Sequence, residues 1–266
     1  IGPQINDLKT ADVVVATPGR FLDHLQRRTI NTSKIKLLVL DEVDRMFDMG
    51  FIDDVKRIIQ ACPGKRQTLV FSATVSPQIA EISRRYMSSP VRVSAEKMVD
   101  PAKLKQVYYD VSRRMKVSLL VHLLRQEKRG LVMVFCNTRR SVDFLVKNLR
   151  ANRVDAIAIH GGLSQNKRSK TIELFNGAKA EVLVCTDVAA RGLHIEGVSH
   201  VYNYEIPKNA TDYIHRIGRT ARVGKDGKVI NLLSDYDHYN FSQGLRDYRH
   251  AEIERGEMPS VNDAVT

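Results

Sequence analysis

The sequence has few cysteines, and it contains no apolar run long enough to cross a membrane. Cys62, Cys136 and Cys185 are isolated, without a Cys-x-x-Cys pair or an even-numbered framework. This spacing argues against structural zinc and indicates a reducing compartment. No signal peptide is recognisable, and no apolar span approaches about 18 residues. We therefore expect a soluble, cytoplasmic protein.

The sequence also lacks the loop G-x-x-x-x-G-K-[ST], whose backbone amides and lysine hold nucleotide phosphates. The Gly-Lys pairs at 64–65, 224–225 and 227–228 have neither the earlier glycine nor the following Ser or Thr. The chain begins at Ile1 rather than at a methionine. We therefore expect it to be a fragment of a longer protein.

Positive charge is present in excess along the whole chain. The 266 residues carry a formal net charge of +12, and lysines and arginines outnumber acids by 14 to 10 through Ser94 and by 28 to 20 after it. Such an excess favours a polyanionic partner, of which nucleic acid is the first candidate. A basic soluble protein without such a partner is the alternative that composition leaves open.

Short apolar runs recur along the chain, and each ends in a polar or small residue. Runs of Val, Ile and Leu fit parallel strands that are buried on both faces. The expected strands are 13–16, 37–40, 68–71, 91–94, 131–135, 156–159, 181–185 and 200–204. The expected helices are 19–26, 53–61, 77–87, 141–151 and 165–175. Strands that alternate with helices indicate an α/β protein with parallel sheets.

The length of the chain favours two domains of ordinary size. A charged stretch without an apolar period separates two series of strands, and we interpret residues 95–106 as a linker. The first domain then comprises residues 1–94 and the second residues 107–250, while residues 251–266 form a polar tail. In sheets of this kind, ligands bind beyond the carboxyl ends of the strands.

An acidic pair follows one of the expected strands. Asp41 and Glu42 come directly after "LLVL", so they stand at the carboxyl end of a buried strand. A carboxylate there can hold Mg²⁺, and its neighbour can deprotonate an attacking water. "FSAT" (71–74) ends the next strand with hydroxyl side chains that could bond to the acids. The alternative interpretation is an acid-rich helix start, which the helix dipole favours.

A cluster of basic residues occurs far downstream, in "HRIGRTAR" (215–222). If this stretch is helical, His215, Arg219 and Arg222 fall at i, i+4 and i+7 and share one face. Two guanidinium groups beside Gly218 suit the spreading negative charge of a transferred phosphoryl group. A solvated basic helix is the alternative interpretation.

Together these motifs resemble the DEAD-box RNA helicases, a family with paired RecA-like domains. "DEVD" (41–44) differs in one letter from the motif that names the family. The motifs that stand around it in the family's order and spacing are "ATPGR" (16–20), "SAT" (72–74), "VFCNT" (134–138), "HGGLSQNKR" (160–168), "TDVAARGLH" (186–194) and "HRIGRTAR" (215–222). The resemblance covers nearly the whole chain. It implies two RecA-like parallel-sheet domains in tandem, the first of them incomplete.

The resemblance implies an ATP site. Asp41 would help to hold Mg²⁺, and Glu42 would be the general base for hydrolysis. The positions that match contacts with the nucleotide are Gly192, His194, Arg219 and Arg222, of which the two arginines match the fingers that reach the γ-phosphate. The positions that match the network coupling the acids to the second domain are Asp44, Ser72, Thr74 and His215.

The resemblance also implies contacts with the RNA backbone, which hold a strand without reading its bases. The matching positions in the first domain are Thr17, Pro18, Gly19 and Arg20. Those in the second domain are Asn137, Thr138, Gln165, Arg168 and Thr186. Without the resemblance, Gln165 and Arg168 also fit surface residues at a helix start. Two positions depart from the family: His194 replaces a usual aspartate that matches a ribose partner, and Ala221 replaces a glycine.

The function that these residues imply is that of an ATP-dependent RNA helicase. It would bind single-stranded or duplex RNA independently of sequence and couple the hydrolysis of ATP, with Mg²⁺, to local unwinding. Because the phosphate loop is absent, we expect this chain alone to lack ATPase activity. One alternative is a non-catalytic RNA-binding or annealing module. Another is a relative that acts on DNA, which "ATPGR" and "HRIGRTAR" disfavour.

Overall fold

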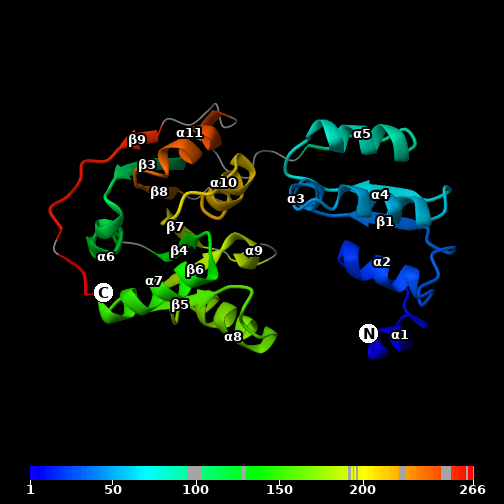
Figure 1. Ribbon diagram of the computed structural model, residues 1–266, viewed down its shortest axis with the longest axis horizontal. Coiled ribbons are helices and arrows are strands. Elements are labelled where there is room, and N and C mark those ends of the chain that lie inside the picture. Colours follow the sequence, from blue (N-terminus) through cyan, green and yellow to red (C-terminus); the bar gives the residue numbers. More distant parts are fainter. Residues whose placement is uncertain are drawn as a thin grey trace. The chain divides into compact units, whose positions relative to one another are not determined.

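The computed structural model divides the chain into two compact units, Ile1–Ser94 and Ala95–Thr266 (Figure 1). The structure describes residues 1–94, 103–126, 130–190, 193, 195, 197–221, 226–246, 253–261 and 263–265, without the side chains of 243–246. Within this part of the chain, every helix is too short or too polar to cross a membrane.

The first unit is built on two parallel strands. β1 (Leu37–Leu40) pairs with β2 (Gln67–Val70) in one continuous register. Its helices are α1 (Gly2–Asp7), α2 (Pro18–Gln26), α3 (Val43–Asp48), α4 (Ile52–Ala61) and α5 (Pro77–Tyr86). The helices predicted at 19–26, 53–61 and 77–87 therefore correspond to α2, α4 and α5 within one residue at each end.

A small apolar core holds the first unit together. Its buried members are Leu40, Val43, Val55, Ile59, Ile79 and Ile82. On α4, Val55 and Ile59 are four residues apart, so both side chains project from the same side of the helix. The start of α5 is defined by Ser76, whose Oγ accepts a hydrogen bond from the Ile79 N–H at 3.4 Å. This N-cap fixes where the chain enters the helix.

Two strands that the sequence predicts are absent from the first unit. Residues 13–16 and 91–94 have irregular backbone, and Val15 and Val93 are 94% and 88% exposed. A parallel strand forms only beside a partner that exchanges hydrogen bonds with it. Within residues 1–94, however, β1 and β2 pair with each other alone. Leu37 and Val39 of β1 are also exposed, so the expectation of a strand buried on both faces is wrong there.

The second unit contains a seven-stranded sheet in which every pairing is parallel and the strand order is β5-β6-β4-β7-β8-β3-β9. Its strands are β3 (Leu104–Asp110), β4 (Leu131–Cys136), β5 (Ala156–Ile159), β6 (Val182–Thr186), β7 (Val198–Asn203), β8 (Gly227–Leu233) and β9 (Ile253–Arg255). Its helices are α6 (Lys116–Gln126), α7 (Arg139–Ala151), α8 (Gln165–Asn176), α9 (Asp187–Ala190), α10 (Ala210–Ile217) and α11 (His238–Arg246). The predicted α/β class with parallel sheets is confirmed.

The central strand β4 shows why this sheet is buried on both faces. Successive side chains of a strand point to opposite faces. Val132 and Val134 enter a core that they share with α6 and α7, whereas Met133 and Phe135 enter a second core that they share with α8 to α11. An uninterrupted apolar run such as "LVMVFC" is therefore what this position in the sheet requires.

The end of the chain differs from the polar tail that the sequence predicts at residues 251–266. β9 lies in this stretch and pairs with β3 in parallel. Val261 and Ala264 pack against the core between the sheet and α6 and α7. The amide of Asn152 exchanges hydrogen bonds with the backbone of Val265, at 2.8 and 3.2 Å. Figure 1 shows this segment in red, running from β9 past α6 to the end of α7.

The last residues are mostly polar, but a few apolar side chains among them pack on the core. The prediction of a polar tail at residues 251–266 is therefore corrected. The predicted linker at 95–106 also overlaps the sheet, because β3 begins at Leu104. Residues 95–102 lie outside the described part of the chain.

A buried ion pair joins the start of α6 to the turn after β8. Lys116 Nζ donates to Asp237 Oδ2 at 2.6 Å and to the Tyr204 carbonyl at 3.1 Å. Ser234 donates to the same Asp237 oxygen through its hydroxyl and its backbone N–H. Burial raises the pKa of Asp237, but the hydrogen bonds from Lys116 and Ser234 outweigh it and hold this pKa below its usual 3.8.

We expect Asp237→Asn to lower the free energy of unfolding of the second unit by roughly 3 kcal/mol at pH 7, because the substitution leaves a buried ammonium without its counter-ion. The stabilisation by Asp237 is complete above its unfolded pKa of 3.8 and is lost as the pH falls through the lower folded pKa. The difference between the two proteins should therefore shrink in acid. Urea unfolding followed by tyrosine fluorescence measures it, since all of the nine tyrosines except Tyr86 lie after residue 94.

Asp235→Asn is the matched control, because Asp235 is exposed and two residues away. Equal stabilities of the Asp237 and Asp235 variants at pH 7 would contradict a structural role for this ion pair.

Candidate nucleotide and RNA site

The acidic pair lies directly after β1, where the chain turns into α3. Asp41 Oδ1 accepts a hydrogen bond from the backbone N–H of Glu42 at 2.9 Å. Glu42 is the N-cap of α3 and has φ 49° and ψ 48°, in the left-handed region that residues other than glycine rarely adopt. Strained backbone of this kind is concentrated at functional sites. Two adjacent carboxylates in a strained turn after a strand make this turn a candidate catalytic element.

The third carboxylate of the same motif joins the turn to the segment that follows β2. Asp44 is buried, and its Oδ2 accepts hydrogen bonds from the backbone N–H and the hydroxyl of Thr74, at 3.0 and 3.1 Å. The Ser72 hydroxyl donates to the Thr74 carbonyl at 2.7 Å. The structure therefore brings together Asp44, Ser72 and Thr74, which sequence reasoning grouped as one network.

The "ATPGR" motif lies at the surface, at the start of α2. Thr17 is the N-cap in extended conformation, and Pro18 occupies the first turn. Gly19 and Arg20 are exposed, and Arg20 lies 3.5 Å from Asp23 on the same helix. The first N–H groups of a helix have no partner within it and carry the positive end of the helix dipole, so they suit a phosphate oxygen.

In the second unit, a buried arginine that sequence reasoning missed ties together the carboxyl ends of three strands. Arg216 is 1% exposed, and its guanidinium group packs over the Phe135 ring. Nε and Nη2 donate to the two carboxylate oxygens of Asp187 at 2.7 and 2.8 Å. Nη2 also donates to Asn137 Oδ1, and Nη1 donates to Asn203 Oδ1 and the Glu205 carbonyl. All five N–H donors of a guanidinium are therefore used.

The same network continues into the sheet through buried polar side chains. Asn203 Nδ2 donates to Asn231 Oδ1 at 2.7 Å, from β7 to β8. Asn231 Nδ2 lies 3.3 Å from the Tyr213 hydroxyl, which donates to Gln106 on β3 at 2.8 Å. A chain of hydrogen bonds thus runs from β3 to the ends of β4 and β6. The signal in the sequence was an asparagine within each of two neighbouring strands, Asn203 in β7 and Asn231 in β8.

The predicted RNA contacts after β4 and β6 include one partner of Arg216 and the sequence neighbours of its partners. The Asn137 side chain accepts from Arg216 and donates to the Ile206 carbonyl, so the protein itself uses both ends of its amide. Thr138 caps α7, with its hydroxyl accepting from the Ser141 N–H at 3.1 Å. Thr186 is 8% exposed at the end of β6 and is followed at once by Asp187.

The other two predicted RNA contacts of this unit lie on α8. Gln165 is the first residue of α8 and is exposed. Arg168 is half-buried, and its Nε is enclosed without a hydrogen-bond partner among the described residues. A buried donor without a partner costs free energy unless a ligand or water satisfies it. Arg168 is thus the residue of this pair that the structure marks for an anionic ligand.

The expected helix through "HRIGRTAR" ends earlier than predicted. α10 stops at Ile217 and Gly218 is its C-cap, so His215 is helical and Arg219 follows the helix. The one-face argument for His215, Arg219 and Arg222 is therefore wrong. Arg219 Nη1 donates to the Leu193 carbonyl at 3.0 Å, which links it to the stretch after α9. Gly192, His194 and Arg222 lie outside the described residues.

His215 carries an unsatisfied polar atom. Its Nε2 is buried and has no hydrogen-bond partner among the residues that the structure describes. The predicted coupling role for His215 requires such a free donor or acceptor, but the coupling itself stays a prediction.

The cysteines of the second unit are unsuited to nucleophilic chemistry. Cys136 and Cys185 are fully buried. Burial raises the pKa of both thiols, and the nearby carboxylates of Glu205 and Asp187 raise it further. The thiolate is the reactive form of cysteine, so both side chains act as core residues.

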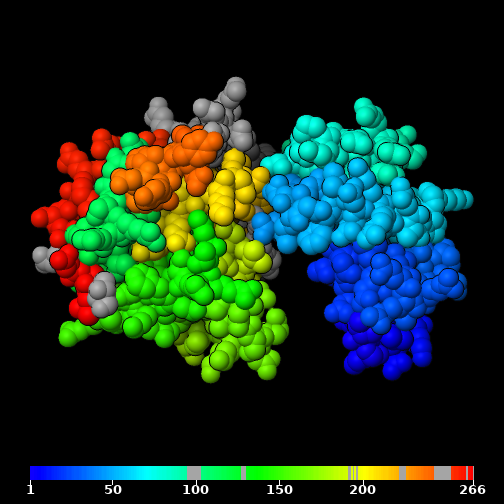
Figure 2. All heavy atoms as spheres, in the orientation of Figure 1, coloured from blue at the N-terminus to red at the C-terminus, as the bar shows by residue number. Residues whose placement is uncertain are grey.

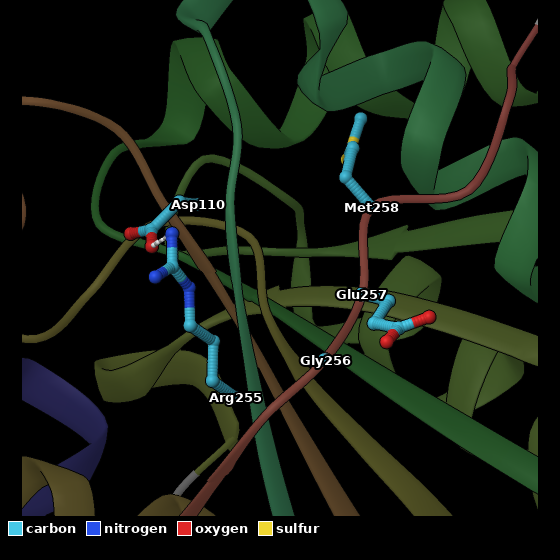
Figure 3. A pocket seen from close by; sticks show the side chains of 5 residues that line it. All are labelled: Asp110, Arg255, Gly256, Glu257 and Met258. Carbon is cyan, nitrogen blue, oxygen red and sulfur yellow. Dashed lines mark ion pairs between the residues drawn. The ribbon is translucent and has the colours of Figure 1, made fainter.

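A hollow of about 370 Å³ lies elsewhere on this unit, beside β3 and β9. Figure 3 shows its lining by Asp110, Arg255, Gly256, Glu257 and Met258, with the Arg255 guanidinium directed at the Asp110 carboxylate at 2.9 Å. None of the predicted nucleotide or RNA contacts lines it. The predicted site residues instead lie at the strand ends and helix starts described above.

Because Arg216 uses all five of its N–H donors, its replacement should destabilise the second unit. We expect Arg216→Lys to lower the free energy of unfolding of the second unit by roughly 3–5 kcal/mol, because an ammonium cannot replace the planar fork and Asp187 is left without its bidentate partner. Urea unfolding followed by tyrosine fluorescence gives the measurement. Arg114→Lys, at an exposed arginine, is the matched control. A loss below about 1 kcal/mol would show that the network contributes little.

Family models match both units of the chain. One described as "DEAD/DEAH box helicase" matches residues 1–82, and one described as "Helicase conserved C-terminal domain" matches residues 115–224. The DEAD-box ATP-dependent RNA helicase CshA of Bacillus subtilis is 40% identical over 268 aligned positions, which cover 100% of this chain and 54% of CshA. The chain thus spans about half the length of the curated relatives that it matches.

Solved structures agree with this assignment. A DEAD box protein from Methanococcus jannaschii is 38% identical with a TM-score of 0.58, and the match covers 96% of this chain and 69% of that one. Saccharomyces cerevisiae Dbp5, solved with RNA and ADP BeF3, is 30% identical with a TM-score of 0.80, and the match covers 92% of this chain and 66% of Dbp5. The chain belongs to the DEAD-box helicase family.

Proposed function

We propose that this chain is part of an ATP-dependent RNA helicase, which couples hydrolysis of ATP to local unwinding of RNA. The observation that carries the proposal is the strained turn at Glu42, which stands between Asp41 and the Asp44–Thr74 clamp. Relatives named as ATP-dependent RNA helicases match the chain over its full length. Dbp5, at 30% identity, was solved with RNA and a nucleotide.

In this proposal the acidic turn performs the catalytic work of the first unit. Glu42 accepts the proton of the attacking water, and its fixed backbone orients the carboxylate before the reaction starts. Asp44 does not touch the reacting atoms. Its three hydrogen bonds, from Thr74 and from the Arg45 N–H, hold the turn in position.

The donor set suits Mg²⁺ bound together with nucleotide phosphates. Mg²⁺ is usually held by one or two carboxylates, with water and phosphate oxygens completing its shell. Asp41 offers one exposed carboxylate, and among the described residues no group of three metal-ligating side chains gathers. Asp41 would hold the ion, which when bound neutralises phosphate charge. Arg219 and Arg222 would neutralise the charge that develops on the γ-phosphate.

The RNA contacts in this proposal are directed at the backbone. Thr17, Pro18, Gly19 and Arg20 would bind phosphates at the start of α2. In the second unit, Thr138, Gln165, Arg168 and Thr186 would do so, while Asn137 mainly positions this region through Arg216. Contacts of this type carry no base information, so binding should be independent of sequence.

The first functional test uses the longer protein that includes the sequence upstream of Ile1. We expect Glu42→Gln to lower RNA-stimulated ATP hydrolysis by roughly 10²–10⁴-fold, because the amide cannot accept the proton. Phosphate release measures the rate, and Asp53→Asn, an exposed acid at the start of α4, is the control. This 266-residue chain by itself should be inactive, since no phosphate loop holds the β- and γ-phosphates.

Robust hydrolysis by the 266-residue chain that depends on Glu42 would contradict the fragment interpretation. RNA binding without any hydrolysis by the longer protein would favour the alternative of a non-catalytic RNA-binding or annealing module.

The second functional test concerns RNA. We expect Arg168→Ala to weaken binding of single-stranded RNA by roughly tenfold, equally across unrelated sequences, and to reduce the salt dependence by about one counter-ion. Fluorescence anisotropy with several labelled oligonucleotides, at a series of salt concentrations, gives both quantities. Lys170→Ala, two residues along α8 and exposed, is the control. A loss confined to one sequence would argue against a backbone contact.

A further inference from the structure

The outer surface of α7 carries an exposed aromatic ring between two cations. Phe144 is 50% exposed, although it stands in a helix whose other large apolar residues are buried. Arg140 lies four residues before it and Lys147 three residues after it, and both are exposed. Residues spaced by three and four positions are neighbours on a helix surface. Arg140, Phe144 and Lys147 therefore form one stripe, which we name the α7 stripe.

The α7 stripe begins beside the proposed RNA contacts of this unit. Thr138 is the N-cap of α7, and at a rise of about 1.5 Å per residue Phe144 lies roughly 9 Å further along the helix axis. Arg139 packs against Gly161, in the loop that leads to Gln165. In Figure 2 the green surface of this part of the second unit adjoins the yellow-green surface, although α7 and α8 themselves pack on opposite faces of the sheet. A strand held at Thr138 therefore needs only a short extension to reach the ring.

The charges around the α7 stripe are mainly positive. The exposed acid of this helix surface is Asp143, which stands three residues after Arg140 and four before Lys147 and so neighbours both. Its Oδ1 lies 3.0 Å from His160 Nε2. Among the described residues, neither Arg140 nor Lys147 forms an ion pair. Both cations thus remain available to a phosphate group.

We propose that the α7 stripe is a second binding surface for single-stranded RNA, on which one base stacks on Phe144 while Arg140 and Lys147 contact the flanking phosphates. An aromatic ring between cations is the combination that proteins use to hold single strands without reading sequence. The proposal rests on the proposed function, because it extends the RNA that Thr138, Gln165 and Arg168 would hold. Its role is to bind the strand that leaves this site.

The chemistry favours RNA over a protein as the occupant. A protein interface of ordinary stability buries a contiguous apolar core, within which charged residues are depleted. The α7 stripe offers one ring between two cations, and it is continuous with the proposed RNA contacts at the start of the same helix.

The test compares two lengths of oligouridine, about 6 and about 14 nucleotides, bound to the full chain and followed by fluorescence anisotropy. Phe144→Ala should weaken binding of the long oligonucleotide by roughly tenfold and leave the short one unchanged. Phe144→Tyr should restore the affinity, since its ring also stacks. Lys147→Gln should lower the slope of log affinity against log salt by about one, again for the long oligonucleotide.

The control is Tyr239→Ala, which removes an exposed ring from α11 and should change neither affinity. Circular dichroism and thermal unfolding verify that each variant is folded. If Arg168→Ala weakens both lengths but Phe144→Ala weakens neither, the stripe does not bind RNA and the proposed function stands. If the chain binds neither oligonucleotide at low salt, both the stripe and the proposed RNA function are overturned.

Discussion

The buried guanidinium group of Arg216 is the constraint on which the second unit depends. A charge removed from water must be paired and hydrogen-bonded, or the fold loses several kcal/mol. Arg216 meets this requirement with groups that follow three strands: Asn137 after β4, Asp187 after β6, and Asn203 and Glu205 at the end of β7. The ends of these strands therefore cannot move independently. That rigidity is what a surface needs if it must hold an RNA backbone in one geometry.

In the first unit, a smaller set of hydrogen bonds orders the turn that carries Asp41 and Glu42. Asp44 is buried and accepts three hydrogen bonds, two of them from Thr74 in the segment after β2. These bonds join the segments that follow the two strands, next to Glu42 with its left-handed backbone conformation. Both units thus use one buried charged side chain to fix the loops that follow parallel strands. In each unit, the residues proposed to bind a ligand lie beside the hydrogen-bond network of the buried charge. The buried charge itself, Asp44 or Arg216, bonds only to groups of the protein.

The surface of the second unit extends this arrangement along a helix. Thr138 belongs to the strand end tied by Arg216, through its neighbour Asn137, and it also caps α7. Because α7 is a continuous helix, the position of Thr138 also sets the position of Phe144, which has Arg140 and Lys147 on either side. Rigid helices position functional groups more accurately than loops do. An RNA strand bound at Thr138 would then reach the α7 stripe at a distance that is fixed by the helix.

Several features of this protein could be predicted from sequence. Apolar runs such as 37–40 and 131–135 correspond to β1 and β4, and the helices at 19–26 and 165–175 correspond to α2 and α8 within one residue at each end, because periodicity and capping are local properties. The motifs identified the family and the grouping of Asp44 with Ser72 and Thr74. Apolar runs alone misled at 13–16 and 91–94, since the same residues form a strand only where a partner strand is present.

Other features were decided by tertiary structure alone. The polar end of the chain supplies β9 because β3 offers it an open edge. Arg216 was not among the predicted site residues, and its partners come from positions 11 to 79 residues away in the sequence. Local sequence specifies how a segment can fold, but which buried charge meets which partner depends on long-range contacts that form when the sheet assembles.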